Sequence, residues 1–512
     1  MSASTSIARR IVGPTLSIAA ALALAGCAIL PKPDAAPLTP AIPAAAAPAA
    51  WQAPLPHDGQ LTELARWWQQ FNDPVLSLLI ESAQAVNPNL AAAQSRIEQS
   101  RAAGVAAQAA LGPNLGANAS AGRGRLDLSA PLGTSLSAGL QAGWEFDLFG
   151  ANRAGRDAAQ ARLDGASAAW HDARVSVAAE VASQYTALRA CEAQVAQTQL
   201  DAASRAETSR LTELAAKSGF QAPANAALAR ASAAQGNSLL TQQRAQCELT
   251  VKAIVALTGI DEPVLRKRLA EGTAKLPQPA QIAIARVPAD ALAQRPDLYS
   301  AARDVQAASA DVAQSSAQRF PRISLNGSIG AARFSTGAGT LDGTVWSLGP
   351  VSVSLPLFDG GTRRANVQAA RARYDEASAV YAARLRGAVR EVEESLIALK
   401  STADRNADAV VATEGFGVSY LAAQARYQGG LASLFELEDS RRTAVLAQSA
   451  LIELQRERVA AWIALYRALG GGWSVGDQRA SGGSVADQPA SGGSTTRLQA
   501  DASAATAAAP KQ

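Results

Sequence analysis

Residues 135–148 read SLSAGLQAGWEFDL, and this stretch decides the fold because apolar and polar positions alternate through it without a break. The apolar positions are Leu136, Ala138, Leu140, Ala142, Trp144, Phe146 and Leu148. A period of two over this length predicts a β-strand with one apolar face. A strand that crosses a membrane needs about 9–11 residues with such a face. The stretch therefore fits a membrane strand, although a soluble sheet with one wet face gives the same pattern.

Shorter alternations follow at 323–330 and 351–357, and each half of the chain offers two strand-like stretches, about 113–148 and 321–358. Aromatic residues are expected toward the strand ends, as in the interfacial girdle of a membrane barrel: Trp144, Phe146, Phe149, Trp346 and Phe358. Four strands in one chain cannot close a barrel, and lipid does not tolerate open sheet edges. Three chains would give twelve strands, whereas two would give eight, whose interior is filled by side chains. A working pore favours three.

A long helix is expected after the strand-like stretches in each half of the chain. Proline is absent from 132–222 and 357–488, which permits helices over about 150–217 and 361–427. Shorter helices are predicted at 88–111, 222–258, 296–319 and 431–469. Each short pair adds up to nearly the length of the long helix and should run antiparallel beside it. Val445, Ile452, Val459 and Tyr466 recur every seven residues, which is the seam spacing of a coiled coil.

The chain repeats itself at a spacing of about 210 residues, which is too long for a solenoid. Five pairs of short motifs recur in order; one is Asn87-Pro88-Asn89-Leu90 with Arg295-Pro296-Asp297-Leu298. We expect a channel region over 57–471, with repeats at about 57–260 and 261–471 and helical tube segments at about 150–258 and 360–469. Residues 472–512, rich in Gly, Ser and Ala, are expected to be a disordered tail.

The segment 1–26 predicts a signal peptide, with Arg9 and Arg10 before an apolar run that is too short to span a bilayer. The run ends in Leu24-Ala25-Gly26-Cys27, which resembles the lipobox of bacterial lipoproteins. The resemblance implies lipidation of Cys27, for example with palmitate, followed by a linker over 27–56. Ala28, rather than Asp, as the second mature residue points to the outer membrane, where acyl chains anchor a protein without spanning the bilayer. An ordinary secretory signal is the alternative.

Composition argues against several other classes of protein. The net charge of +4, with both signs interspersed, supplies no basic field for nucleic acid. The chain has two His and three Cys, and its single Met is the first residue, so a metal site is not expected. His57 and His171 are predicted to face solvent. No catalytic motif is present, so we expect no enzyme activity and no cofactor besides the lipid.

With these features in place, the chain resembles the TolC-type outer-membrane efflux proteins, in the lipoprotein branch named after nodulation protein T. The stretches that carry the resemblance are 67–74 (WWQQFNDP), 294–298 (QRPDL), 320–325 (FPRISL) and 356–361 (PLFDGG). It implies a mixed fold, a membrane β-barrel on a long α-helical coiled-coil barrel, made by a homotrimer. It also implies a passive exit duct for small molecules such as drugs, joined to a periplasmic adaptor and an inner-membrane resistance-nodulation-division transporter. A type I secretion duct and a non-conducting periplasmic scaffold are the alternatives.

The same resemblance places a narrow periplasmic aperture near 427–439. Glu436 and Asp439 fall on its acidic positions, and Arg442 falls on a basic position found in some members. Residues three apart share a helix face, so threefold symmetry would make two acidic rings. Ala432 stands where other members carry an Arg of the closing network. The first repeat has Asn225 and no acid at its tip. A solvated charged face is the alternative.

Cys191 and Cys247 stand at equal distances in the sequence before and after Gly219. In an antiparallel hairpin that turns at this glycine, the two side chains would be level with each other. An oxidising compartment would preserve a disulfide between them. Two unpaired thiols, packed as small apolar groups, are the alternative.

Overall fold

The computed structural model describes residue 52 and residues 64–125, 131–278, 292 and 294–473. The chain divides into two compact units, Met1–Trp473 and Ser474–Gln512, and every described residue belongs to the first. The predicted signal peptide, Cys27, His57 and nearly all of the predicted tail lie outside the described residues.

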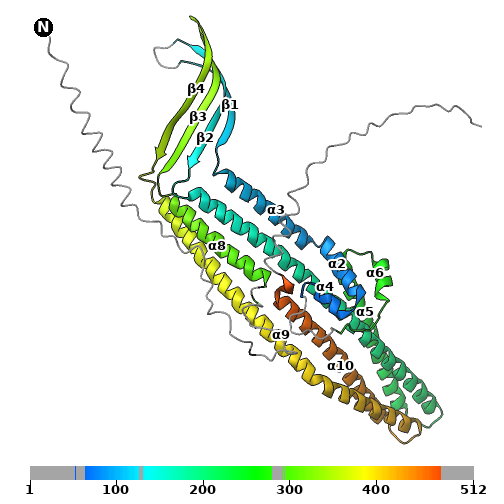
Figure 1. Cartoon of the computed structure of the whole chain (residues 1–512). Helices are drawn as coiled ribbons and strands as arrows, with labels where there is room; N and C mark the ends of the chain where they lie inside the picture. The colour runs from blue at the N-terminus through cyan, green and yellow to red at the C-terminus, as the bar shows by residue number, and fades with distance from the viewer. Residues whose placement is uncertain (1–51, 53–63, 126–130, 279–291, 293, 474–512) are drawn as a thin grey trace, which may run out of the picture. The chain divides into compact units, whose positions relative to one another are not determined.

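Two successive sets of elements make up the described part (Figure 1). The first set is η3 (Leu64–Phe71), α2 (Pro74–Val86), α3 (Pro88–Ala109), β1 (Asn114–Gly124), β2 (Gly133–Phe146), α4 (Ala151–Lys217), α5 (Pro223–Thr258) and α6 (Glu262–Leu269). The second set is α8 (Pro296–Ala317), β3 (Arg322–Thr336), β4 (Gly339–Ser354), α9 (Thr362–Gln428), α10 (Leu434–Ala468) and η4 (Gly470–Gly472). The six helices and the strand pairs stand where the sequence predicted them.

Corresponding helices of the two sets have nearly equal lengths. The long helices α4 and α9 have 67 residues each, α3 and α8 have 22 each, and α5 and α10 have 36 and 35. α4 packs along α3 and α5, and α9 packs along α8 and α10. The predicted packing of each short pair beside its long helix is therefore confirmed. Contacts of α4 with α8 and α10 join the two sets into one helical layer.

Local signals set the ends of these helices. Pro88, Pro223 and Pro296 are the first residues of α3, α5 and α8, where the missing N–H is no loss. The long helices start after Gly150 and Gly361, whose φ angles of 79° and 90° favour glycine. The predicted seam on α10 is confirmed, since Ile452, Val459 and Tyr466 are buried and Val445 is half-buried.

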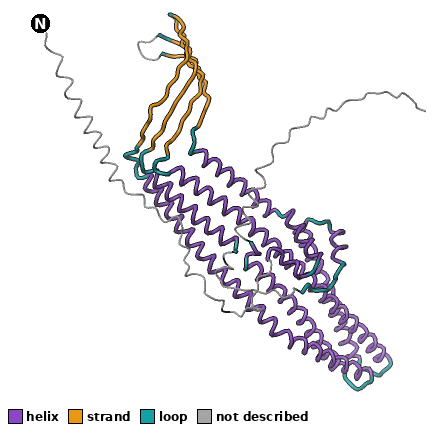
Figure 2. Tube along the Cα trace, viewed as in Figure 1, coloured by secondary structure: helices purple, strands orange, loops and turns teal. Residues whose placement is uncertain are grey.

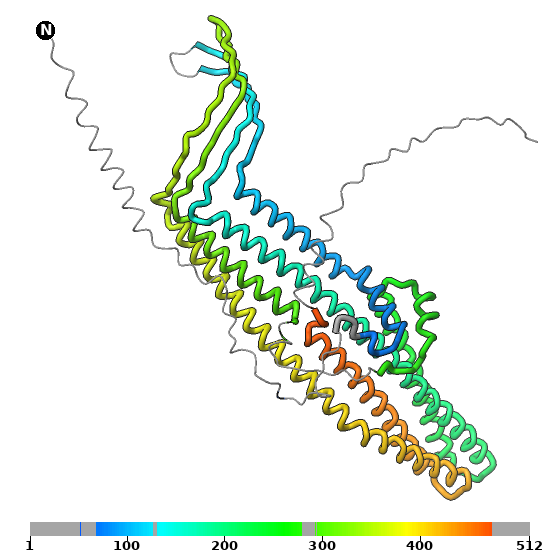
Figure 3. Tube along the Cα trace, viewed as in Figure 1, coloured from blue at the N-terminus to red at the C-terminus, as the bar shows by residue number. Residues whose placement is uncertain are grey.

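Four elements were not predicted. α2 begins after Asp73, whose carboxylate accepts from the N–H of Val75 at 2.9 Å, with proline at the first helical position. An Asp-Pro pair before an apolar run is a recognised helix start, so the sequence contained enough information to predict α2. The other three are η3, α6 and η4. Leu265 and Leu269 of α6 belong to the same buried cluster as side chains of α2, although the two helices are far apart in the sequence (Figure 3). The largest buried cluster includes side chains of α2, α4, α6 and α10.

The four strands form one antiparallel sheet in the order β1-β2-β3-β4. Figure 2 shows the strands at one end of the helices, with short loops between the two kinds of element. The alternation in 135–148 is confirmed as a strand up to Phe146; Leu148 lies beyond it, because its N–H donates to the carbonyl of Phe146 at 2.8 Å in a turn. No helix among the described residues is long and apolar enough to cross a membrane.

Candidate functional site

The sheet has one apolar and one polar face over most of its length. Side chains two apart on a strand, and register partners on neighbouring strands, share a face. We define the apolar face by Leu115, Ala117, Ala119, Ala138, Leu140, Ala142, Trp144, Phe146, Ile323, Leu325, Ile329, Ala331, Trp346, Leu348, Val351 and Val353. The polar face carries Asn114, Asn118, Ser120, Ser137, Gln141, Glu145, Ser324, Asn326, Ser328, Ser347 and Ser352.

Hydrogen bonds support this division. Serine hydroxyls pair across neighbouring strands on the polar face: Ser120 with Ser137 at 2.8 Å, Ser324 with Ser352 at 2.7 Å and Ser328 with Ser347 at 2.8 Å. A β-bulge in β4 keeps the two faces separate, since the register shifts between Leu325 and Gly327. The extra residue in the bulge puts Leu348 and Val351 on one face despite their odd separation. From Val353 to Trp346 the fourth strand therefore follows the pattern of the other three, whereas beyond Trp346 it places Val345 on the polar face and Thr344 on the apolar face.

The apolar face has a defined height. It runs without a charge from the register level of Phe146 to that of Ala138, which is about 26 Å along the strands. Tilted by about 40°, such a stretch spans roughly 20 Å, close to the ~25 Å apolar band of a membrane barrel. One level beyond Ala138 on this face, the pattern inverts: Arg333 and Asp342 are register partners.

Four of the five predicted girdle residues lie at the helical end of the sheet. Trp144 Nε1 donates to the carbonyl of Leu111 at 3.0 Å, and its ring centre lies 4.3 Å from that of Phe146. Phe149 stacks on Phe320 at 4.9 Å, beyond the end of β2, and Phe358 lies beyond the end of β4 with 93% of its side chain exposed.

The expected position of Trp346 toward a strand end is wrong. Trp346 is the eighth residue of the 16-residue β4 and pairs with Ile329. Its level is one step short of Ala138 on the same face, so Trp346 lies near the outer limit of the apolar face. The strands simply continue past that limit, which hydrophobic alternation alone did not reveal.

At the other end of the helices, α9 and α10 form the second hairpin, which carries the predicted aperture residues. Ser433 caps α10 by accepting from the N–H of Glu436 at 3.1 Å. Arg426 Nη1 lies 2.5 Å from Glu436 Oε1, and Arg442 pairs with Asp439. All three predicted residues lie on the exposed side of α10, whereas Leu434 and Leu437 are buried. Each acid therefore has a basic partner within the chain.

The sequence did not identify a cluster of buried and half-buried polar side chains that joins the second hairpin to the first hairpin, α4 and α5. We define this inter-hairpin cluster as Asp201, Arg205, Ser232, Glu438 and Arg441. Arg441 is 2% exposed, pairs with Glu438 and donates to Thr208 Oγ1 of α4 at 2.8 Å.

The first hairpin supplies the rest of the cluster. Arg205 of α4 donates to Asp201 Oδ2 at 2.7 Å and to Ser232 Oγ of α5 at 2.8 Å. Ser232 Oγ donates in turn to Glu438 Oε2 at 2.8 Å. The run of charges at 436–442 was a readable signal, but sequence alone could not tell the buried Arg441 from the exposed Arg442.

Two further predicted positions can be placed. The structure has a disulfide bond between Cys191 and Cys247, with a Cα–Cα distance of 5.6 Å, across α4 and α5. His171 is half-buried rather than solvent-facing, because its ring lies 4.9 Å from Trp170 and 6.1 Å from Trp473. Among the described residues, no group of three His, Cys, Asp or Glu side chains could hold a metal ion.

Buried charges in the helical layer carry shifted pKa values. Burial raises the pKa of Asp172 on α4, and the nearby carboxylate of Asp297 raises it further, against three arginines that act in the opposite direction. Burial also raises the pKa of Tyr185, whose hydroxyl donates to Asp73 Oδ2 at 2.6 Å. Both groups lie on α4 and not in the sheet.

Comparison with known proteins gives a consistent result. The sequence model of the family described as "Outer membrane efflux protein" matches residues 79–260 and 287–471. The pyoverdine export outer membrane protein OpmQ of Pseudomonas putida is 31% identical, over 85% of this chain and 94% of the relative. The solvent efflux pump outer membrane protein SrpC of the same species is 30% identical, over 90% and 98%. The solved structure of the outer-membrane channel OprN superposes with a TM-score of 0.76 at 28% identity, covering 83% of this chain and 97% of that one.

Proposed function

The chain belongs to the outer membrane efflux protein family and is an outer-membrane efflux channel, and from this premise we propose how it is assembled and what it joins. The observation that carries the proposal is the four-stranded sheet with one apolar face, one polar face and two free edges, β1 and β4. An open edge is costly in lipid because its backbone groups have no partners.

Three chains would pair these edges and still leave an open pore, whereas the interior of an eight-stranded barrel made by two chains would be filled by side chains. β4 of one copy would pair with β1 of the next, which gives a twelve-stranded barrel, a size within the range of bacterial outer-membrane barrels. The apolar face then contacts lipid, and the hydroxyl and amide groups of the polar face line the pore. The long helices of the three copies continue the pore as a tube in the periplasm.

The hairpin ends are the proposed contacts with the rest of an efflux pump. Phe220, Leu431 and Phe435 lie at the two tips with 84%, 75% and 74% of their side chains exposed. A single exposed apolar side chain is common, but three large ones together at the hairpin tips support an interaction site there. We assign the tips to a periplasmic adaptor, which couples the channel to a resistance-nodulation-division transporter that selects small-molecule cargo such as drugs.

The proposed closed aperture is formed by the second hairpin. Glu436 and Asp439 with their arginine partners form its charged surface, and the inter-hairpin cluster holds this hairpin against the first. Ala432 contributes no charge to this closure. Arg441, farther along the chain on α10, instead supplies the buried cation between the hairpins.

The N-terminal proposal is a lipid anchor on Cys27. Its test is the Cys27→Ser variant, because acylation needs the thiol. We expect loss of palmitate labelling with export of the chain retained; labelling at the normal level would refute the anchor. Efflux should survive, since the barrel itself holds the membrane.

Conductance tests the channel proposal as a whole. The purified full-length protein, inserted into planar bilayers, should give uniform conductance steps and cross-link as a trimer. A non-conducting scaffold would give no steps. Coexpression with a matching adaptor and transporter should lower drug susceptibility, whereas a type I secretion duct would leave it unchanged and release a protein instead.

A further inference from the structure

The change of polarity at the outer end of the sheet creates a charged border on the apolar face. Arg333 and Asp342 are register partners on β3 and β4, level with Leu136 on β2 and Ala121 on β1. One residue farther out, Phe334 and Leu341 are partners and point to the opposite face. On β3 and β4 the two polarities therefore exchange faces within a single step, whereas Leu136 of β2 and Ala121 of β1 keep the apolar face apolar.

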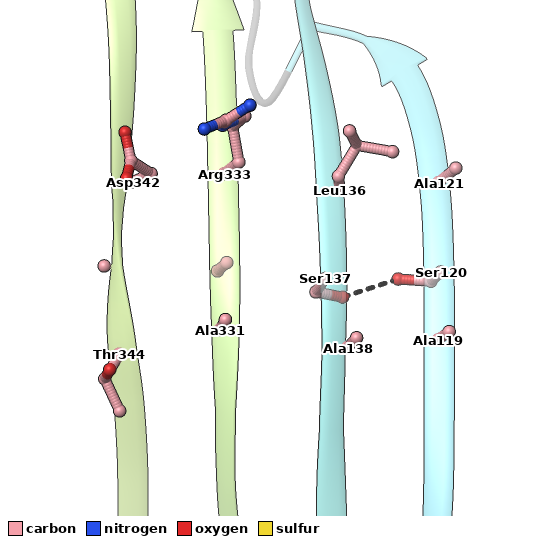
Figure 4. Close-up of a pocket in the computed structure, with 12 residues that line it drawn as sticks. Ala119, Ser120, Ala121, Leu136, Ser137, Ala138, Ala331, Arg333, Asp342 and Thr344 are labelled. Carbon is pink, nitrogen blue, oxygen red and sulfur yellow. Dashed lines mark hydrogen bonds between the residues drawn. The ribbon is translucent and has the colours of Figure 1, made fainter.

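A shallow hollow of about 790 Å³ lies at the same border, and residues of all four strands line it (Figure 4). Most of its lining residues have side chains on the apolar face, at the levels of Ala138 and Leu136, whereas Ser120, Ser137, Ala332 and Gly343 stand at the level between them and face the other way. On the apolar face most of this lining is alanine, namely Ala119, Ala121, Ala138 and Ala331, with Leu136 and Thr344 beside them. On the apolar face, small side chains therefore surround the inner part of the hollow, and its outer rim carries Arg333 and Asp342.

The charge of the rim is positive. Arg123 on β1 stands two residues beyond Ala121 and hence on the same face. Among the described residues of the strands, Asp342 is the acid on this face at this border, against Arg123 and Arg333. Arg333 and Asp342 form no ion pair in the described structure, and the bond drawn in Figure 4 joins Ser120 and Ser137 instead. The Arg333 guanidinium therefore keeps its donors for another acceptor.

We propose that this hollow binds an anionic, phosphorylated lipid of the outer leaflet, with an acyl chain over the alanines and the headgroup phosphate on Arg333. The inference rests on the proposed function, because it requires the apolar face to contact lipid. Charge complementarity selects the occupant, since a guanidinium offers paired N–H donors that match phosphate oxygens. An arginine at the border of the bilayer costs little, in contrast to one at its centre.

The test measures binding of bisphosphorylated lipid A to the full-length protein in phosphatidylcholine nanodiscs, by native mass spectrometry. Arg333→Gln should weaken binding about tenfold, the size expected for a charged hydrogen bond. Arg322→Gln, on the same strand at the helical end, is the matched control and should bind as the wild type does. Dephosphorylated lipid A should not distinguish Arg333→Gln from the wild type. The phosphate contact is overturned if Arg333→Gln binds phosphorylated lipid A as the wild type does. It is also overturned if Arg333→Gln weakens binding of the phosphorylated and the dephosphorylated lipid equally.

A second variant tests the hollow itself. Ala138→Leu fills the space over β2 and should weaken binding of the phosphorylated and dephosphorylated lipids alike. Unchanged binding by this variant, together with unchanged binding by Arg333→Gln, removes the site altogether.

A separate measurement distinguishes failure of this site from failure of the channel proposal. Brominated acyl chains quench tryptophan on contact, and Trp346 lies on the apolar face. Trp346→Phe should therefore remove part of the quenching. If it removes none, the face does not contact lipid, and both the barrel assignment and the lipid site fall. If quenching is normal but Arg333→Gln binds as the wild type does, only the lipid site falls.

Discussion

The two hairpins have almost the same dimensions and very different surroundings. α4 and α9 are each 67 residues long, but 23 residues of α4 are buried and only 10 of α9. α4 packs along α3, α5, α8 and α10, whereas α9 packs along α8 and α10. In this chain α4 lies inside the helical layer and α9 forms one of its borders. A border helix of this length is the surface on which the proposed trimer places the next copy.

A disulfide bond also distinguishes the first hairpin from the second. When positions are counted from the first residue of each helix, Cys191 of α4 corresponds to Thr402 of α9. In the same way, Cys247 of α5 corresponds to Arg458 of α10. The first hairpin therefore has a covalent bond where the second has none. In the proposed channel, the first hairpin is the fixed wall and the second is the part that moves.

The largest effect should come from the bond that only the first hairpin has. The disulfide closes a loop of 56 residues, for which the chain-entropy model gives about 4 kcal/mol of stabilisation. Cys191→Ser with Cys247→Ser should lower the melting temperature of the purified protein markedly while leaving conductance nearly unchanged. Scanning calorimetry and planar bilayers measure the two quantities.

A reductant supplies the control for this prediction. It should bring the wild type to the melting temperature of the double variant and leave the variant where it is. Two free thiols per chain in the denatured, unreduced mature protein would contradict the bond, and a large change in conductance would contradict the fixed-wall assignment.

The second effect should come from the contact between the hairpins. Arg441→Met keeps the volume but removes a buried cation from Glu438 and Thr208, at a cost of about 3 kcal/mol. Because this contact holds the second hairpin in place, the variant should also open the channel. We expect larger conductance and greater sensitivity to large antibiotics in cells. The matched control is Arg442→Met, whose side chain is 67% exposed and whose ion pair is worth less than about 1 kcal/mol. If both variants behave alike, the cluster is not the contact that closes the channel.

The unequal roles of Arg441 and Arg442 show how far the sequence could be read. Period-two alternation and the absence of proline from 132–222 and 357–488 were enough to place the strands and the long helices, because these signals are local to each stretch of sequence. The equal spacing of Cys191 and Cys247 about Gly219 also correctly predicted that the two residues lie level with each other on the hairpin. Which of two adjacent arginines is buried depends on α4, which is remote from both in the sequence. The outer limit of the apolar face depends on the register between strands, which alternation within one strand does not reveal. The expected position of Trp346 toward a strand end was wrong for this reason.

The third effect concerns the acids at the tip of the second hairpin, Glu436 and Asp439, since residues 219–230 at the first tip include no acid. Glu436→Ala with Asp439→Ala should reduce cation selectivity, because acidic rings raise the local concentration of cations in a constriction. Arg426 and Arg442 neutralise these acids in part, so we expect a change of a few-fold in the permeability ratio, less than about 1 kcal/mol. Reversal potentials under a salt gradient measure it, with Asn225→Ala at the first tip as control. An unchanged reversal potential would remove Glu436 and Asp439 from the conduction path.

The smallest effect concerns Asp172 on α4, whose carboxylate is partly buried inside the helical layer, and tests how this burial changes the stability of the protein. Asp172 of α4 and Ala383 of α9 occupy corresponding positions, counted from the first residue of each helix. Burial, followed by the charge of Asp297, raises the pKa of Asp172 above its ordinary value. The folded state therefore binds the proton more tightly than the unfolded state, so this group adds stability as pH falls through the raised pKa and loses it as pH rises. Asp172→Asn mimics the protonated form and should raise the melting temperature slightly at neutral pH, with less gain near the unfolded pKa of about 3.9. Ala383→Asp places the same charge on an exposed site of α9 and should change little. A lower melting temperature for Asp172→Asn at neutral pH would show that its ion pairs with nearby arginines outweigh the cost of burial.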